Sequence, residues 1–276
     1  MTMNKLVYSL VGSAALAASA FAGTDKSAKD ISPVVAPAEE DLGLTLGVAY
    51  DSRYYFRGFN MANNWVSSSL DWTLPINKEL RLDVGANYGS AANDVSRFGT
   101  GEGSTFDHTS FERLQLSANL VADLGPVEVG AGFRWYDNMG DYRGILNNGE
   151  EVGVNVSSKL GPINVGAGAY RDFGGNGQGF YFEGAVNTEI KLCDRVSLVP
   201  GANIGFANDY NYQLNVGGFT PHASSWTAVD LSLALPIKLS KRATLSPYVA
   251  INFPMHSLDA VENNRFFGGV SLAVKF

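Results

Sequence analysis

The chain has 276 residues, and its 20 Lys and Arg against 27 Asp and Glu give a net charge of −7. This acidic balance argues against nucleic-acid binding, which needs a basic surface. Charged residues make up only 17% of the chain, aromatic residues reach 12%, and there are 31 glycines. The composition argues against a disordered chain and against a mainly helical one, because glycine is unfavourable inside helices.

Residues 1–22 are predicted to be a secretory signal peptide. Lys5 precedes an apolar run rich in Ala and Ser, and Ala20-Phe21-Ala22 has the pattern of a cleavage site. A permanent helical anchor is disfavoured because the run is short. The mature chain is therefore expected to begin at Gly23 and to be exported. Its single cysteine, Cys193, cannot form an internal disulfide.

Residues 23–41 contain Pro33, Pro37, small residues and charges, and this composition predicts a flexible periplasmic segment. From residue 42 to residue 276 the chain reads as one domain. Apolar residues alternate there with small or polar ones, which is the period of β-strands. We expect about twelve strands, with ten or fourteen as alternatives. The expected strands are 44–57, 64–74, 80–90, 111–122, 127–136, 151–160, 163–172, 179–191, 196–206, 225–235, 243–253 and 265–276.

The connections between these strands are alternately short and long. Short ones such as "PINKE" and "DLGP" carry the Gly and Pro residues of tight turns. Long ones include 90–110, 137–150 and 207–224. This pattern is typical of an antiparallel up-and-down transmembrane β-barrel, with periplasmic turns and extracellular loops. A soluble β-sandwich is the weaker alternative.

Charged residues in the predicted strands fall almost entirely on the less apolar face. Glu112 and Arg171 are exceptions, and both lie near a loop end where a long side chain reaches water. A charge facing lipid at mid-bilayer costs roughly 2–4 kcal/mol, so the charged face is expected to line the lumen. The predicted lumen acids are Asp51, Asp71, Asp83, Glu128, Glu151, Asp172, Glu183, Glu189 and Asp230. The predicted lumen bases are Arg53, Arg57, Arg81, Arg113, Arg134, Lys159, Lys191, Arg265 and Lys275.

The segment "DSRYYFRG", residues 51–58, carries three of these charges at the end of the first predicted strand. Because alternate residues of a strand share a face, Tyr55 is expected in the lumen with Asp51, Arg53 and Arg57. Tyr54 and Phe56 are expected to face outward in an aromatic girdle, and Gly58 to begin the first loop.

The chain ends in "GGVSLAVKF", in which Val270, Leu272, Val274 and the terminal Phe276 alternate. The pattern resembles the terminal strand signature that the barrel-assembly machinery reads in Gram-negative outer-membrane proteins. "YYFRG" also resembles the end of the first strand in an uncharacterised family of Gram-negative outer-membrane β-barrel proteins, with an aromatic-x-Arg-Gly segment. The resemblance implies a fold and an outer-membrane location, but no reaction.

We find no catalytic, cofactor or metal motif in the sequence. His108, His222 and His256 lie in predicted loops without a placed Ser and Asn partner, and "DNMGD" lacks most ligands of a calcium loop. The long loops are acidic, and Asp137, Asp141 and Glu150 are expected to form an outer mouth that attracts cations.

The sequence therefore predicts a narrow passive channel for small polar solutes, with a mild cation preference and outer-membrane lipid around it. The alternative is a non-conducting envelope scaffold or adhesin-like barrel that acts through its loops.

Overall fold

The computed structural model describes residues 42–92, 111–140, 148–174, 179–211, 222–256, 258–259 and 262–276. The predicted signal peptide and the segment 23–41 lie outside these residues, as do Asp141 and His108. Among the described residues there is no helix long and apolar enough to span a membrane.

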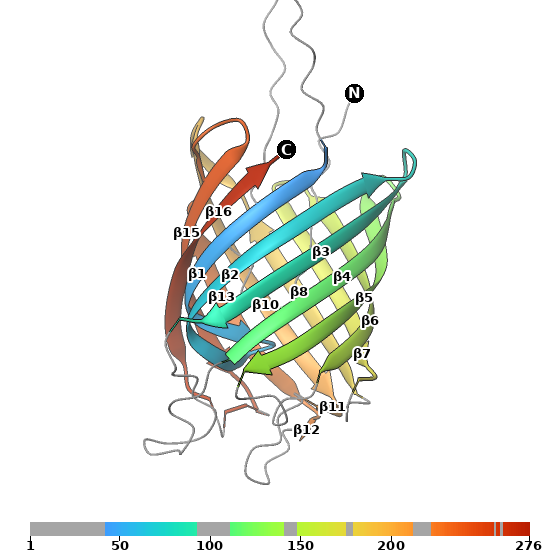
Figure 1. Cartoon of the computed structure of the whole chain (residues 1–276), viewed down its shortest axis with the longest axis vertical. Helices are drawn as coiled ribbons and strands as arrows, with labels where there is room; N and C mark the ends of the chain where they lie inside the picture. The colour runs from blue at the N-terminus through green and yellow to red at the C-terminus, as the bar shows by residue number, and fades with distance from the viewer. Residues whose placement is uncertain are drawn as a thin grey trace, which may run out of the picture.

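The described chain is a closed antiparallel β-barrel (Figure 1). Two strands are interrupted: β8 is continued by β9, and β13 by β14, so twelve strands cross the wall. The strands are β1 (Leu44–Phe56), β2 (Phe59–Pro75), β3 (Leu80–Ala91), β4 (Phe111–Asp123), β5 (Val127–Gly140), β6 (Gly149–Leu160), β7 (Ile163–Asp172), β8 (Phe180–Thr188), β9 (Ile190–Cys193), β10 (Val196–Asn208), β13 (Trp226–Ala234), β14 (Ile237–Lys238), β15 (Ala243–Pro254) and β16 (Arg265–Lys275). The short pair β11 (Tyr210–Asn211) and β12 (His222–Ala223) lies outside the wall.

The first and last strands close the barrel. They pair from Thr45↔Lys275 to Asp51↔Gly269, and they lie side by side in Figure 1 as the blue and dark red ribbons. The Leu42 N–H donates to the Phe276 carbonyl at 2.8 Å. No sheet edge is left along this paired seam, as a membrane requires of a spanning sheet.

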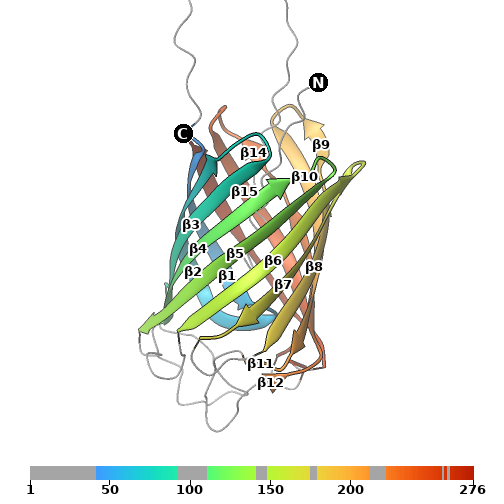
Figure 2. The ribbon, with the colours of Figure 1, turned by 90° about the vertical axis from the view of Figure 1, so that its right-hand side faces the viewer.

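The two barrel ends differ. Tight turns at residues 76–79, 124–126, 161–162 and 194–195 lie at the end that holds the closing seam's Leu42 and Phe276, and we call it the turn end. The opposite end carries the connections from β3 to β4 and from β5 to β6 (Figure 2), and we call it the loop end. In this fold class the turn end faces the periplasm.

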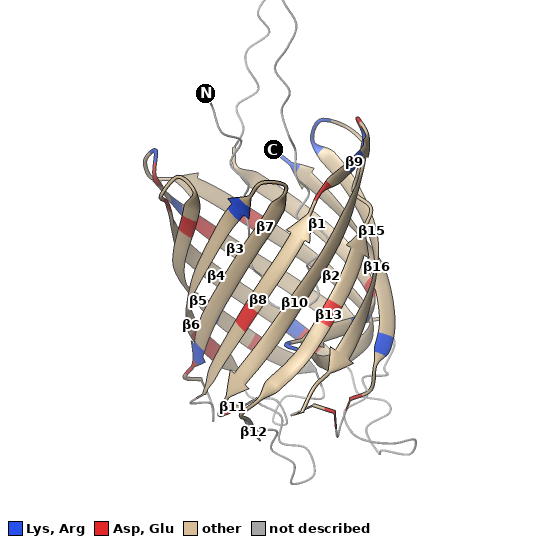
Figure 3. Ribbon diagram, turned by 180° about the vertical axis from the view of Figure 1, so that it is seen from behind, with Lys and Arg blue, Asp and Glu red and all other residues tan. Residues whose placement is uncertain are grey.

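The outer surface of the wall is apolar, as the alternation predicts. Large side chains such as Val48, Leu116 and Val154 are exposed there, and most of the wall seen in Figure 3 carries no charge. The two exceptions noted in the sequence behave as expected for loop-end charges. Glu112 accepts a hydrogen bond from Tyr88 at 2.9 Å, and the Arg171 guanidinium lies 5.5 Å from the Phe180 ring centroid.

Candidate functional site

The candidate site is the end of the β1–β2 hairpin, which bends into the lumen. Pairing of β1 with β16 stops at Asp51↔Gly269, and pairing of β2 with β3 starts at Trp65↔Ala91. Between these points the hairpin pairs with itself as far as Phe56↔Phe59. We call residues 54–63 the hairpin tip; its bend is seen inside the barrel in Figure 2.

The local sequence explains how the chain makes this bend. A register shift between Tyr54 and Tyr55 marks a β-bulge, which kinks a strand. Arg57 and Gly58 have φ values of 55° and 86°, as a two-residue hairpin turn requires. A Cβ on Gly58 would lie 2.5 Å from the Ala228 Cβ of β13. The glycine therefore serves both the turn and the close approach to the far wall.

This geometry corrects three sequence expectations. Strand β2 begins at Phe59 rather than at residue 64, so the first connection is a two-residue turn and Gly58 begins no loop. Phe56 is 5% exposed and packs edge-on against Tyr136 at 5.5 Å, inside the barrel. Tyr54 stacks on the lumen-facing Trp65 at 4.5 Å and accepts a hydrogen bond from Arg113. Because the hairpin tip bends into the lumen, both of its faces are covered, and outward parity no longer means contact with lipid there.

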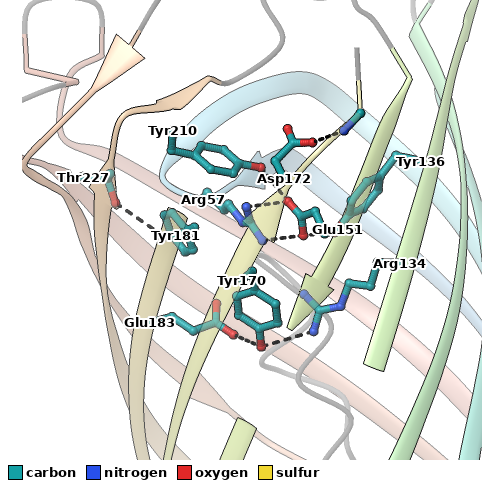
Figure 4. A network of polar contacts seen from close by, with 11 residues as sticks. Arg57, Arg134, Tyr136, Glu151, Tyr170, Asp172, Tyr181, Glu183, Tyr210 and Thr227 are labelled. Carbon is teal, nitrogen blue, oxygen red and sulfur yellow. Dashed lines mark hydrogen bonds and ion pairs between the residues drawn. The ribbon is translucent and has the colours of Figure 1, made fainter. Parts of the chain in front are cut away.

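Arg57 is held at the centre of the tip by a buried ion pair with Glu151 of β6 (Figure 4). Its Nη1 lies 2.6 Å from Oε1 and its Nη2 donates to Oε2 at 2.7 Å, and both side chains are almost completely buried. The Tyr136 and Tyr210 hydroxyls donate to the same carboxylate at 3.2 and 2.7 Å. The bidentate geometry and the added donors satisfy a charge pair that would otherwise be costly to bury.

Aromatic rings enclose the Arg57 guanidinium. Its Cζ lies 4.3 Å from the Tyr181 ring centroid and 4.6 Å from that of Tyr210, within the range of cation–π attraction. Tyr170 forms the next layer: it accepts from Arg134 at 3.3 Å and donates to Glu183 at 2.8 Å. We call this face of the tip, toward β4 to β8, the sealed side.

The connection between β15 and β16 holds the tip from a second direction. Leu258 is fully buried, and its Cδ1 would lie 3.2 Å from a Cβ on Gly58. The Asn60 N–H donates to Glu262 Oε1 at 3.0 Å. Burial raises the pKa of Glu262 to about 7, although the Asn60 hydrogen bond and the nearby Arg265 and Arg53 act to lower that pKa.

The opposite face of the tip lies toward β13, β15 and β16, and we call it the polar side. Tyr55 packs there on Phe267, with ring centroids 4.8 Å apart. Tyr248 donates to Asp51 at 2.5 Å, and Asn252 donates to Asp230 at 2.6 Å.

Toward the turn end the lumen is lined by small and polar residues. The register aligns Ser69, Asn87, Gly85, Ser117 and Asn119 on the inward face of β2 to β4. Here Arg81 binds Glu128 with two hydrogen bonds, at 2.8 and 3.1 Å, and Asp83 at 3.1 Å. These three side chains retain some exposure, unlike the pair at the hairpin tip.

The remaining predicted residues lie as follows. Register brings Arg134, Glu151 and Asp172 together across β5, β6 and β7, and Asp71 pairs across from Thr45. The acidic mouth needs correction, because Asp137 and Glu150 belong to β5 and β6 rather than to a loop. Both lie on the face opposite the lumen-facing Tyr136 and Glu151. Val270, Leu272 and Val274 share the outward parity of the closing strand, and Phe276 directly follows its last residue, Lys275.

Sequence reasoning missed the tyrosines that surround Arg57. Tyr136, Tyr170 and Tyr181 have lumen parity on β5, β7 and β8, but only charged residues were considered as the lumen lining of these strands. The signal available in the sequence was that these tyrosines lie on the same strand face as the predicted lumen charges Arg134 and Glu183. Among the described residues, no group of His, Cys, Asp or Glu side chains could hold a metal ion.

No protein-family model matches the sequence, and no curated protein matches it at significant similarity. Solved structures do match in fold. An outer membrane channel from Pseudomonas putida F1 gives a TM-score of 0.56 at 14% identity, over 88% of this chain and 100% of that one. The KdgM porin gives 0.49 at 10% identity, over 84% and 99%. LpxR from Salmonella typhimurium gives 0.48 at 11% identity, over 84% and 100%.

The closed twelve-stranded wall and the likeness to the Pseudomonas structure define the class. The chain has the fold of the outer-membrane β-barrels of Gram-negative bacteria. The predicted resemblance is thus confirmed at the level of the fold.

Proposed function

We propose that this barrel is a narrow passive channel for small polar solutes in the outer membrane of a Gram-negative bacterium. The supporting observation is the lining of the turn-end half. Its inward side chains are small or polar, and residues such as Ser117, Asn155 and Gly201 are only half-buried, so water reaches them. The hairpin tip then forms the narrowest part of the channel. The fold likeness to a protein described as an outer membrane channel agrees with this role.

A mild cation preference follows from three lumen aspartates rather than from the loop acids. Asp51 accepts a hydrogen bond from Tyr248 and Asp230 accepts one from Asn252, while Asp71 Oδ1 lies 3.1 Å from the Cβ position of the inward-facing Gly85. None of the three forms an ion pair with a Lys or Arg within 4 Å in the described part of the chain. Their negative charge is therefore not cancelled by direct contact, and it raises the local cation concentration.

The test is a reversal potential across a planar bilayer under a KCl gradient, with the purified full chain. We expect a small conductance that favours K⁺, and a loss of that preference in Asp51→Asn/Asp71→Asn/Asp230→Asn. Glu112→Gln is the control, because it removes a carboxylate from the outer face. An unchanged reversal potential in the triple variant would disprove this origin of the selectivity.

The non-conducting scaffold is the second candidate, and one observation favours it. The sealed side of the tip is completely buried around Arg57 and Glu151, so this half of the lumen admits no solute while the tip stays inserted. If neither the wild type nor a variant with residues 54–63 replaced by a short turn conducts, a role through the loops replaces the channel.

Biogenesis is part of the same proposal. Export by a signal peptide predicts a mature N-terminus at Gly23, which sequencing of outer-membrane material would identify. The Phe276 N–H donates to the Leu44 carbonyl at 2.9 Å, so the terminal residue lies on the closing seam. Deleting Phe276 should slow insertion by the barrel-assembly machinery without changing export. Normal insertion kinetics after the deletion would contradict the proposed signal.

A further inference from the structure

The two faces of the hairpin tip differ in how deeply the charged groups next to the tip are buried. On the sealed side, Arg57 and Met61 are 1% and 0% exposed. On the polar side, Asp51 is 8% exposed, whereas four other charged residues are half-buried. They are Arg53 of β1, Asp230 of β13, Arg265 of β16 and Glu262 just before β16. A solute that passes an inserted tip therefore has to pass along the polar side.

Two buried polar atoms on the polar side have no hydrogen-bond partner among the described residues. One is the hydroxyl of Tyr55, whose residue is 1% exposed, and the other is Oδ1 of Asn252, which is fully buried. The Asn252 amide nitrogen donates a hydrogen bond to Asp230. Buried donors and acceptors are nearly always satisfied, so such a pair in one region indicates a place where a polar molecule binds.

Charges of both signs surround the Tyr55 hydroxyl. Glu262, Arg53, Asp230 and Arg265 all lie close enough to interact with it electrostatically. Within the described residues, neither guanidinium forms an ion pair within 4 Å with either carboxylate. The cluster therefore presents two cationic and two anionic groups that are not neutralised by direct contact.

This inference rests on the proposed channel function. We propose that solutes pass the hairpin tip on its polar side, and that the cluster around Tyr55 is a selectivity site for small zwitterions such as α-amino acids. A guanidinium binds a carboxylate through paired hydrogen bonds, whereas carboxylates accept from an ammonium group. A solute with only one of these charges leaves half of the cluster without a partner. Such a solute therefore occupies the site less often.

The experiment measures solute entry into liposomes that contain the purified full chain. The probes are glycine, acetate, ethylammonium and acetamide, which are similar in size and differ in charge. The pH is 8, so that the Glu262 carboxylate is ionised. We expect glycine to enter faster than acetamide. Tyr55→Phe should reduce the glycine to acetamide ratio by about two- to tenfold, as the loss of one buried hydrogen bond predicts.

Two further variants separate selectivity from folding. Arg53→Gln/Arg265→Gln should lower the glycine ratio and raise the relative entry of ethylammonium, because the acidic groups remain. Tyr88→Phe removes a hydroxyl from the outer face and is the matched control; it should leave every ratio unchanged. Circular dichroism verifies that each variant retains the barrel.

The outcomes distinguish the two proposals. If no probe enters any liposome, the channel function itself is wrong. If all four probes enter at rates that neither Tyr55→Phe nor the double variant alters, the channel stands and the zwitterion site is wrong. A glycine preference that survives both variants would also overturn the site, because it would have to originate elsewhere in the lumen.

Discussion

The loop-end half and the turn-end half of this lumen contain the same residue types but arrange them differently. At the loop end, Arg57 and Glu151 form an ion pair with no access to water and four tyrosines nearby. At the turn end, Arg81 bridges Glu128 and Asp83 while all three keep some exposure. The Arg57–Glu151 pair fixes the inserted hairpin tip. The Arg81, Glu128 and Asp83 group lines the wall of the aqueous half of the lumen.

The difference between the halves shows how burial sets the value of a charge pair. Exposed pairs contribute about 0–1 kcal/mol. Removing one partner of a buried pair costs roughly 3–5 kcal/mol, because the remaining charge stays without water or counterion. Substitutions in the hairpin tip should therefore have larger effects on this barrel than substitutions elsewhere.

Arg57→Ala should have the largest effect. It leaves the Glu151 carboxylate buried among tyrosines, so we expect roughly 3–5 kcal/mol lost from insertion of the tip. The released tip should increase single-channel conductance in planar bilayers.

Arg57→Met/Glu151→Leu is the matched control for Arg57→Ala. An apolar pair of similar volume removes both charges, and such replacements are often neutral, so the double variant should restore the small conductance. Equal conductance in Arg57→Ala and the wild type would contradict the role of this pair.

Gly58→Ala should come next. The new Cβ meets Ala228 at 2.5 Å and the backbone has φ of 86°, so both steric overlap and strain oppose insertion. Urea unfolding in lipid vesicles should show a loss of at least about 1 kcal/mol.

Gly125→Ala measures how much of the stability loss in Gly58→Ala comes from backbone strain alone. Gly125 has φ of 90° in a turn, with nothing within 4 Å of its Cβ position. If the two variants lose equal stability, close packing of the tip against β13 contributes nothing.

A pH response should follow from Glu262. Insertion of the tip raises the pKa of this carboxyl from 4.5 to about 7 by burial, so the inserted state binds the proton more tightly than a released one. Insertion is then strongest below pH 4.5 and weakens as pH rises toward 7. Arg53 and Arg265 lie close enough to Glu262 to interact with its carboxylate electrostatically.

Conductance recorded at pH 5 and pH 8 tests this linkage. We expect a larger open fraction at pH 8, and Glu262→Gln should remove most of the difference. A pH response that persists in Glu262→Gln would assign the effect to another group.

Asp83→Asn should have the smallest effect. Arg81 keeps its two hydrogen bonds to Glu128, and the Arg81 and Asp83 side chains are 9% and 15% exposed. We expect a change in unfolding free energy within about 1 kcal/mol, measured by the same urea titration. A loss as large as that of Arg57→Ala would contradict the distinction between the two halves.

The sequence by itself determined the wall of this barrel. The period-two alternation from Leu44 to Phe276 identified twelve strands, because a lipid-facing side chain and a lumen-facing side chain obey different solvation rules at every step. The same alternation placed Glu151, Arg134 and Glu183 on one face.

Only the tertiary structure decided the course of residues 54–63. Alternation describes a strand that stays in a wall, whereas the bulge at Tyr54 and Tyr55 takes the hairpin out of it. Once inside the barrel, both faces of the tip are covered, so Phe56 and Tyr55 are buried although they have opposite parity. Which strands meet Arg57 depends on barrel closure, which brings residues 94 positions apart in sequence into contact.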